Sequence, residues 1–325
     1  MVGIVGFEQS RHDIGRRTAL GFGGMALFAA VTPQAAAAKA RRAMHVDAPT
    51  RFVEANGVRY AYRRFGSESG VPLLFLQHFT GGLDHWDPLV TDGLGRGRPV
   101  ILFDNAGVGA SGGEVPQTIE GMAEHVSIFS RALGLDRFDL LGFSMGGMVA
   151  QACATGGDER LRRLMLVGTG PRGGDPTPHQ ADVAKHARGN GSLDDFLFLF
   201  FGRSDAAVAA GRAFWERRHA RKTDIDLPIR PESILAQVTA ARDWAIPKGP
   251  RFEDLRSITV PTLVVNGSDD IMIPTVNSFY LQQNIPEGQL IVYPDSGHAS
   301  HFQYPALFVD HAALFLDGPR PGAGA

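Results

Sequence analysis

Short apolar runs separated by helical patterns dominate the chain from Arg51 onward. Six of the runs are continuous rather than alternating, which is typical of strands covered on both faces in a parallel sheet. They span residues 71–77, 100–103, 138–141, 164–167, 260–265 and 290–293. Helical patterns occupy residues 118–133, 145–155 and 305–316. This alternation predicts an α/β fold, in which right-handed crossovers connect the strands of a mostly parallel sheet.

Two further features divide the chain. Segments 51–54 and 58–65 flank Asn56-Gly57, a strong signal for a β-hairpin at the start of the sheet. Residues 173–252 carry helical patterns but no convincing strand, so we expect a helical cap inserted between two strands. The predicted sheet core is then 51–172 and 253–318, and the Pro/Gly/Ala-rich tail 319–325 is predicted to be disordered.

The first forty residues have the pattern of an export signal. Arg16 and Arg17 precede an apolar run over 19–31, and the alanine-rich stretch 35–40 follows. The paired arginines resemble a twin-arginine signal, which predicts a periplasmic or secreted protein. The apolar run is too short for a stable membrane span, so none is expected in the mature form.

Composition excludes several partners and cofactors. The net charge is −2 and no basic stripe occurs, so nucleic acid is not an expected partner. The single cysteine, Cys153, excludes an internal disulfide and a cysteine-based zinc site. No histidine/carboxylate cluster has the spacing of metal ligands, so neither a metal nor another cofactor is predicted. The oligomeric state is left open.

The segment Gly142-Phe143-Ser144-Met145-Gly146 joins a predicted strand to a predicted helix. A serine on such a sharp turn is lifted clear of the sheet, and small residues are required two positions to either side. A serine nucleophile also needs a base and an acid that orients the base. Candidates for both follow the later strands, with Asp269-Asp270 after residue 265 and His298 after residue 293.

From about residue 51 to 317 the chain resembles the α/β-hydrolase superfamily, in the style of small esterases, enol-lactonases and cofactor-free haloperoxidases. The resemblance implies a mostly parallel eight-stranded sheet flanked by helices, with the helical cap before the strand that carries the acid. It assigns Ser144 as nucleophile, Asp270 as acid with Asp269 as the alternative, and His298 rather than His301 as base. The motifs that carry the last two assignments are Gly267…Asp270…Pro274 and Gly297-His298…Pro305.

The resemblance also implies an oxyanion hole made of two backbone N–H groups. One is that of Met145, and the other comes from the loop Gln77-His78-Phe79-Thr80, where Phe79 stands in place of the usual glycine. Thr80 is the predicted donor, with Phe79 as the alternative. His78 is interpreted as a structural loop histidine. The predicted substrate pocket is lined by Phe79, Trp86, Phe143 and Trp244.

These residues predict a serine hydrolase that cleaves a moderately apolar carboxylic ester or lactone through an acyl-enzyme. Perhydrolase, haloperoxidase and carbon–carbon bond hydrolase activities use the same triad and stay open as alternatives. A small-molecule receptor of the same fold is a further alternative, which the intact triad disfavours. The segment 107–112 also satisfies a dinucleotide-binding pattern, but no helix follows it directly, so nucleotide binding is not expected.

Overall fold

The computed structural model describes residues 44–187 and 191–319. The predicted export signal lies outside these residues, as does the predicted disordered tail apart from residue 319. The described residues form an eight-stranded sheet in the order β1-β2-β4-β3-β5-β6-β7-β8. The strands are β1 (Arg51–Ala55), β2 (Val58–Gly66), β3 (Leu73–Leu76), β4 (Pro99–Phe103), β5 (Phe138–Phe143), β6 (Leu161–Val167), β7 (Thr262–Gly267) and β8 (Gly288–Tyr293).

Strand direction agrees with the sequence pattern. β1 pairs antiparallel with β2, and β2 pairs antiparallel with β4. All remaining neighbours, from β4 through β3 to β8, are parallel. In the opening hairpin Asn56 and Gly57 both have positive φ, 50° and 75°, as a two-residue turn that follows the twist of the strands requires. The predicted mostly parallel α/β sheet is confirmed.

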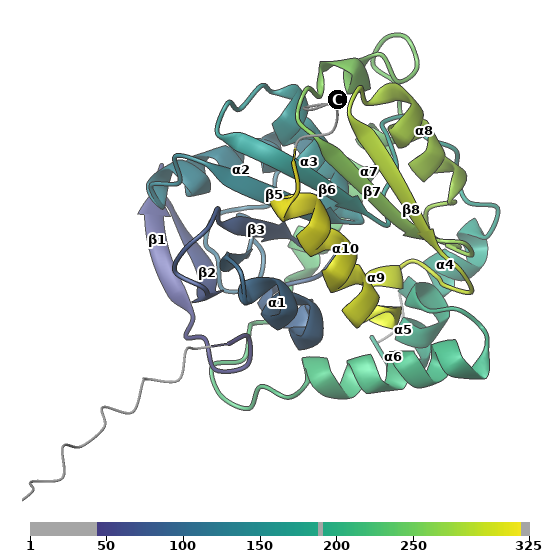
Figure 1. Cartoon of the computed structure of the whole chain (residues 1–325), viewed down its shortest axis with the longest axis horizontal. Helices are drawn as coiled ribbons and strands as arrows, with labels where there is room; N and C mark the ends of the chain where they lie inside the picture. Colours follow the sequence, from purple (N-terminus) through teal and green to yellow (C-terminus); the bar gives the residue numbers. More distant parts are fainter. Residues whose placement is uncertain (1–43, 188–190, 320–325) are drawn as a thin grey trace, which may run out of the picture. The chain divides into compact units, whose positions relative to one another are not determined.

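Helices cover both faces of this sheet (Figure 1). They are α1 (Pro88–Gly95), α2 (Ile119–Ala132), α3 (Met145–Thr155), α4 (Gln180–Ala187), α5 (Leu193–Phe200), α6 (Asp205–Arg218), α7 (Pro231–Trp244), α8 (Val276–Asn284), α9 (Ser300–Gln303) and α10 (Pro305–Asp317). One apolar core joins the sheet to α2, α3, α7 and α8, and the other joins it to α1, α5, α6, α9 and α10. Alternate residues of each central strand enter alternate cores, because successive side chains point to opposite faces.

The segment between β6 and β7 contains α4, α5, α6 and α7, and we call residues 173–252 the helical insertion. Its apolar run, residues 196–201, forms most of α5 and the turn after it. Phe196, Phe200 and Phe201 are buried, and Phe214 of α6 stacks on Phe302 beside the sheet core. The insertion therefore packs as part of the same compact unit as the sheet.

Candidate active site

Ser144 stands at the turn between β5 and α3. Its backbone has φ 55° and ψ −118°, a conformation that costs a residue with a side chain about 1–3 kcal/mol. Two hydrogen bonds hold the turn, from Ser144 N–H to the Val167 carbonyl (2.9 Å) and from Thr169 Oγ1 to the Ser144 carbonyl (2.8 Å). A Cβ at Gly142 would collide with the Gly146 carbonyl, which explains the small residues in the motif.

Asp270 and His298, predicted from different loops, lie side by side. Asp270 follows β7 and His298 follows β8, and their Oδ2 and Nδ1 atoms are 2.8 Å apart with both side chains fully buried. The other carboxylate oxygen accepts the N–H groups of Met272 (2.8 Å) and Ile273 (3.0 Å), which fixes the carboxylate. The Nδ1 atom donates to Asp270, so Nε2 carries the lone pair of the neutral ring. This Nε2 is buried and has no partner among the described residues.

Asp269 and His301, the alternative candidates for the acid and the base, do not take part in this pair. Asp269 is exposed and its carboxylate accepts from Ser268, its neighbour in the chain. His301 is fully buried against the rings of Phe143 and Phe302. Neither side chain has the Asp–His contact that Asp270 and His298 make.

Ser144 opens into a cavity of about 310 Å³ beneath the helical insertion, within the size range of small-molecule sites. The same cavity is lined by Met272 of the acid loop, and the Phe143 ring, next to Ser144 in the chain, lies 5.1 Å from the His298 ring. Apolar walls come from the insertion and the oxyanion loop: Phe79, Phe196, Leu199, Phe200, Ile229 and Ile234. The site thus combines a serine, a buried Asp–His pair and a mostly apolar chamber.

In the oxyanion loop, residues 77–80, the structure differs from the prediction that the Thr80 N–H is free to donate to the oxyanion. Thr80 has φ 62°, and its N–H donates to the side-chain carbonyl of Gln237 at 2.8 Å. The predicted donor is therefore already engaged by a residue of α7. The N–H of Phe79 has no hydrogen bond within the described part of the chain, which favours the alternative assignment. Met145, at the first position of α3, offers the second N–H at the positive end of that helix.

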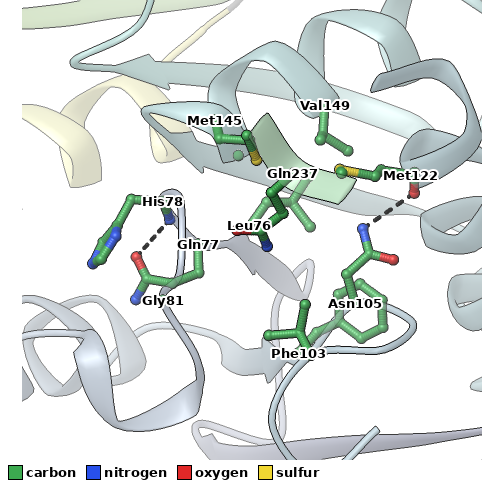
Figure 2. A pocket seen from close by; sticks show the side chains of 12 residues that line it. Leu76, Gln77, His78, Gly81, Phe103, Asn105, Met122, Met145, Val149 and Gln237 are labelled. Carbon is green, nitrogen blue, oxygen red and sulfur yellow. Dashed lines mark hydrogen bonds between the residues drawn. The ribbon is translucent and has the colours of Figure 1, made fainter. Parts of the chain in front are cut away.

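Gln237 also lines a small space of about 40 Å³ behind this loop, together with His78, Gly81 and Met145. Figure 2 shows the side chains of Gln237, His78 and Met145 among those that line this pocket. The loop is fixed from its own side as well, because the Gln77 side chain accepts the N–H of His78 at 2.8 Å. Gln237 thus holds one side of the loop that would present the Phe79 N–H.

Replacing Gln237 by methionine should loosen this loop, because the Thr80 N–H loses its acceptor while the side-chain volume is kept. We expect kcat to fall about 10-fold, with a smaller change in KM, as for a group that positions an oxyanion donor. Steady-state kinetics on an ester substrate would measure this. Arg242→Met, an exposed position on the same helix, is the control. An unchanged kcat for Gln237→Met would remove Gln237 from the site.

The predicted pocket residues divide into two groups. Phe79 lines the Ser144 cavity, as expected. Trp86 and Phe143 do not, because they are buried in the sheet core, with exposed fractions of 1% and 0%. Trp244 is buried in the core that joins the sheet to α2, α3, α7 and α8, and its indole N–H donates to the Gly170 carbonyl at 3.2 Å. The assignment of Trp86, Phe143 and Trp244 to the pocket wall is corrected accordingly, since core packing and cavity lining select the same large apolar residues.

His78 behaves as the structural histidine that the sequence suggested. Its Nδ1 donates to the Phe79 carbonyl at 2.7 Å, and its ring packs edge-on against Phe143 and Phe200. Burial lowers the pKa of His78 to about 3. The ring is therefore neutral at physiological pH, and its one hydrogen bond stabilises the oxyanion loop.

A pair of carboxyl groups ties the insertion to the end of β4. Asp104 and Asp226 both accept the N–H of Leu83, at 3.1 Å and 2.8 Å. Burial raises the pKa of Asp104 well above its ordinary value, and the neighbouring Asp226 carboxylate raises it further. Burial also raises the pKa of Asp226. Two carboxyl groups this close share a proton, because both cannot carry a negative charge without strong repulsion.

The stability that this pair contributes is fully present below the ordinary aspartate pKa of about 3.9 and is lost as the pH rises through the raised values. Asp226→Asn keeps an acceptor for Leu83 and supplies an amide donor to Asp104. We expect it to raise Tm by about 2–4 °C near about pH 8, and less in acid. Thermal unfolding over a pH series measures this, with exposed Asp182→Asn as control. A difference that grows toward acid pH would contradict the shared proton.

Sequence reasoning did not single out three residues that shape this site: Gln237, His85 and Arg218. His85 and Arg218 line the Ser144 cavity, and Gln237 contacts its oxyanion loop. Gln237 acts through a partner 157 positions away in the chain, and Arg218 through the lack of a partner, which no local pattern records. Within residues 44–187 and 191–319, no three His, Cys, Asp or Glu side chains gather as metal ligands would, and no helix is long and apolar enough to cross a membrane.

Comparison with known proteins places this architecture in a family. The α/β-hydrolase-fold family model matches residues 71–305. An α/β-hydrolase-fold protein from Chitinophaga pinensis has 42% sequence identity and a TM-score of 0.81, over 85% of this chain and 100% of the other. RutD of Rhizobium rhizogenes, for which carbamate hydrolysis is the proposed activity, is 24% identical over 73% of this chain and 88% of its own.

A further relative is the 2-hydroxy-6-oxo-6-(2'-aminophenyl)hexa-2,4-dienoic acid hydrolase of Metapseudomonas resinovorans. It is 24% identical over 82% of this chain and 90% of its own. The family match spans most of the chain, from β3 to the start of α10, and includes Ser144, Asp270 and His298. The chain is a hydrolase that belongs to the α/β-hydrolase-fold family.

Proposed function

We propose that this hydrolase cleaves a carboxylic ester or lactone through an acyl-enzyme on Ser144. The observation that carries the proposal is the buried 2.8 Å hydrogen bond between Asp270 and His298, at the sheet edge where Ser144 opens into the cavity. A base held by a buried carboxylate is the arrangement that activates a serine hydroxyl.

The proposed reaction follows from these positions. Ser144 Oγ attacks the substrate carbonyl carbon while its proton passes to His298 Nε2. Asp270 holds the ring tautomer and stabilises the imidazolium that forms. The N–H groups of Met145 and Phe79 donate to the developing oxyanion. Collapse of the tetrahedral intermediate expels the alcohol, which takes the proton from His298, and water then releases the acid by the same steps in reverse.

One alternative has a specific observation in its favour. One relative is a hydrolase named for a dienoic acid that contains a ketone and no ester. Hydrolysis of such a ketone breaks a carbon–carbon bond, and the same triad could serve that reaction. Perhydrolysis would use the same acyl-enzyme with hydrogen peroxide in place of water.

Covalent labelling tests the proposal. A fluorophosphonate should label the wild-type protein stoichiometrically, and peptide mapping should locate the adduct on Ser144. A panel of p-nitrophenyl esters of increasing acyl length, together with lactones and a dienone acid, would then identify the reaction. Labelling at Ser144 with turnover of the dienone acid alone would favour carbon–carbon hydrolysis. No labelling at all would refute the serine mechanism.

We also propose that residues 1–40 direct export by the twin-arginine route. The paired arginines and the apolar run of 19–31 support this. Fractionation of cells that express the full chain, compared with an Arg16→Lys/Arg17→Lys variant, tests it. Accumulation of the variant in the cytoplasm is expected, and equal distribution of the two chains would contradict the proposal.

A further inference from the structure

One charged side chain in the Ser144 cavity has no partner of its own. Arg218, the last residue of α6, lines this cavity, and its Nε is buried without a hydrogen-bond partner among the described residues. No ion pair or hydrogen bond of its guanidinium occurs within residues 44–187 and 191–319. The Arg218 side chain as a whole is half-buried. A cation partly withdrawn from water without an anion is unfavourable for folding, so such a residue calls for a functional explanation.

The other arginines of the described chain make the contrast clear. Every one that is not exposed has a hydrogen bond or an ion pair. Arg217, the neighbour of Arg218 on α6, binds the buried carboxylate of Asp87 with two hydrogen bonds of 2.9 Å and 2.6 Å. Of these two adjacent residues of α6, one is therefore paired with a carboxylate and the other is not. Arg217 holds the helix in place, whereas Arg218 faces the chamber.

The surroundings of Arg218 orient it rather than neutralise it. Its guanidinium lies over the rings of Phe196 (5.0 Å) and Trp215 (5.1 Å). These cation–π contacts hold a cation without satisfying its hydrogen-bond donors. Asp84 attracts Arg218 from farther off, but that carboxylate is already bound to Arg63. Burial still lowers the pKa of Arg218 to about 10, so the side chain stays charged at physiological pH.

A second donor lies in the same wall. His85 also lines the cavity, and its Nδ1 accepts the N–H of Gly82 at 3.0 Å. The proton of the neutral ring must then be on Nε2, which makes His85 a hydrogen-bond donor. Burial and the nearby Arg218 charge both lower the pKa of His85, so the ring is neutral. Asp195, the carboxylate on the cavity wall, is bound by His186 (2.8 Å) and Ser192, and does not serve Arg218.

From this arrangement we infer that the substrate carries an anionic group, a carboxylate, which binds Arg218 and the Nε2–H of His85 while its ester or lactone carbonyl lies at Ser144. The inference rests on the proposed function. It changes the expected substrate from a plain apolar ester to one with an apolar middle and a charged end. A guanidinium is well suited to this role, because its planar donors match the two oxygens of a carboxylate.

Matched substrates test the inference without any mutation. One series is the monoethyl esters of straight-chain dicarboxylic acids from succinate to suberate. The neutral series replaces the free carboxylate by an isopropyl group of similar shape. A third series, O-acetyl ω-hydroxy acids, carries the carboxylate on the alcohol side. We expect wild-type kcat/KM to favour the anionic member of at least one matched pair by about 10- to 150-fold, the value of a hydrogen bond to a charged group.

Variants then test whether Arg218 causes the preference for anionic esters. Arg218→Gln should remove it mainly by raising KM for the anionic esters, and by a much larger factor than for the neutral esters. Arg218→Lys should keep part of it, because the charge remains while the planar fork is lost. Arg212→Gln, an exposed position on α6, should behave as wild type. Arg218→Gln should also be at least as stable as wild type, because it removes an unpaired, half-buried charge, whereas replacement of a structural arginine would lower Tm.

The outcomes separate this inference from the proposed function. Fluorophosphonate labelling of Ser144, with no preference for anionic esters in either series, would overturn the Arg218 inference alone. Absence of both labelling and ester turnover would refute the proposed function. Binding gives a readout independent of turnover. Adipate should raise the Tm of Ser144→Ala and should have no such effect on the Ser144→Ala/Arg218→Gln double variant; an equal shift in both would also overturn the inference.

Discussion

Replacing Ser144 by alanine is expected to lower kcat by about 10⁶-fold, since removal of a serine nucleophile abolishes the covalent step entirely. Steady-state kinetics with an ester substrate measures the loss. Ser300→Ala is the matched control, because that hydroxyl is buried at the first residue of α9, two positions after His298, and has no hydrogen bond in the described chain. The control should stay within a few-fold of wild type.

A stability measurement separates chemistry from folding at this position. Ser144→Ala keeps a Cβ at φ 55°, so the strain of the turn remains and Tm should hardly change. Ser144→Gly removes that strain, and should stabilise the protein by about 1 kcal/mol even though it is equally inactive. Loss of activity in Ser144→Ala together with a large fall in Tm would show a structural role instead.

Changing Asp270 to asparagine is the second large effect that we expect, a fall in kcat of about 10⁴-fold. The carboxylate accepts the Nδ1–H of His298, and an amide in its place favours the other ring tautomer, in which Nε2 can no longer take a proton. Asp269→Asn is the control, because that side chain is exposed and has no contact with His298. A larger fall for Asp269→Asn would transfer the role of acid to Asp269.

The fold was predictable because its signals are local and repeated. Six continuous apolar runs and one Asn-Gly turn marked all eight strands, and the predicted helices over 118–133, 145–155 and 305–316 correspond to α2, α3 and α10. α1 was not predicted, because its eight residues include two glycines and make only about two helical turns, too few for a clear apolar periodicity. Its start is defined by Asp87, whose carboxylate caps Leu89 N–H at 2.9 Å.

The site likewise contains features that the sequence could predict and features that it could not. Asp270 and His298 could be predicted as neighbours, because parallel strands bring their following loops to one edge of the sheet. The hydrogen bond of Thr80 could not be predicted, because its N–H donates to a residue 157 positions later in the chain. Trp86 and Trp244 were misplaced because size and apolarity do not distinguish a core residue from a cavity wall. Arg218 was missed because its significance is the absence of a partner, which only tertiary structure reveals.

The bond between Gln237 and Thr80 has a consequence for engineering this enzyme. The sheet carries the reacting groups, and the helical insertion encloses the substrate, which suggests an exchangeable module. The two are not independent, because α7 of the insertion also holds the backbone of the oxyanion loop. A chimera that receives its insertion from a relative would change selectivity and turnover together. Grafts that end before α7, or that keep Gln237 in place, would let the two properties be altered one at a time.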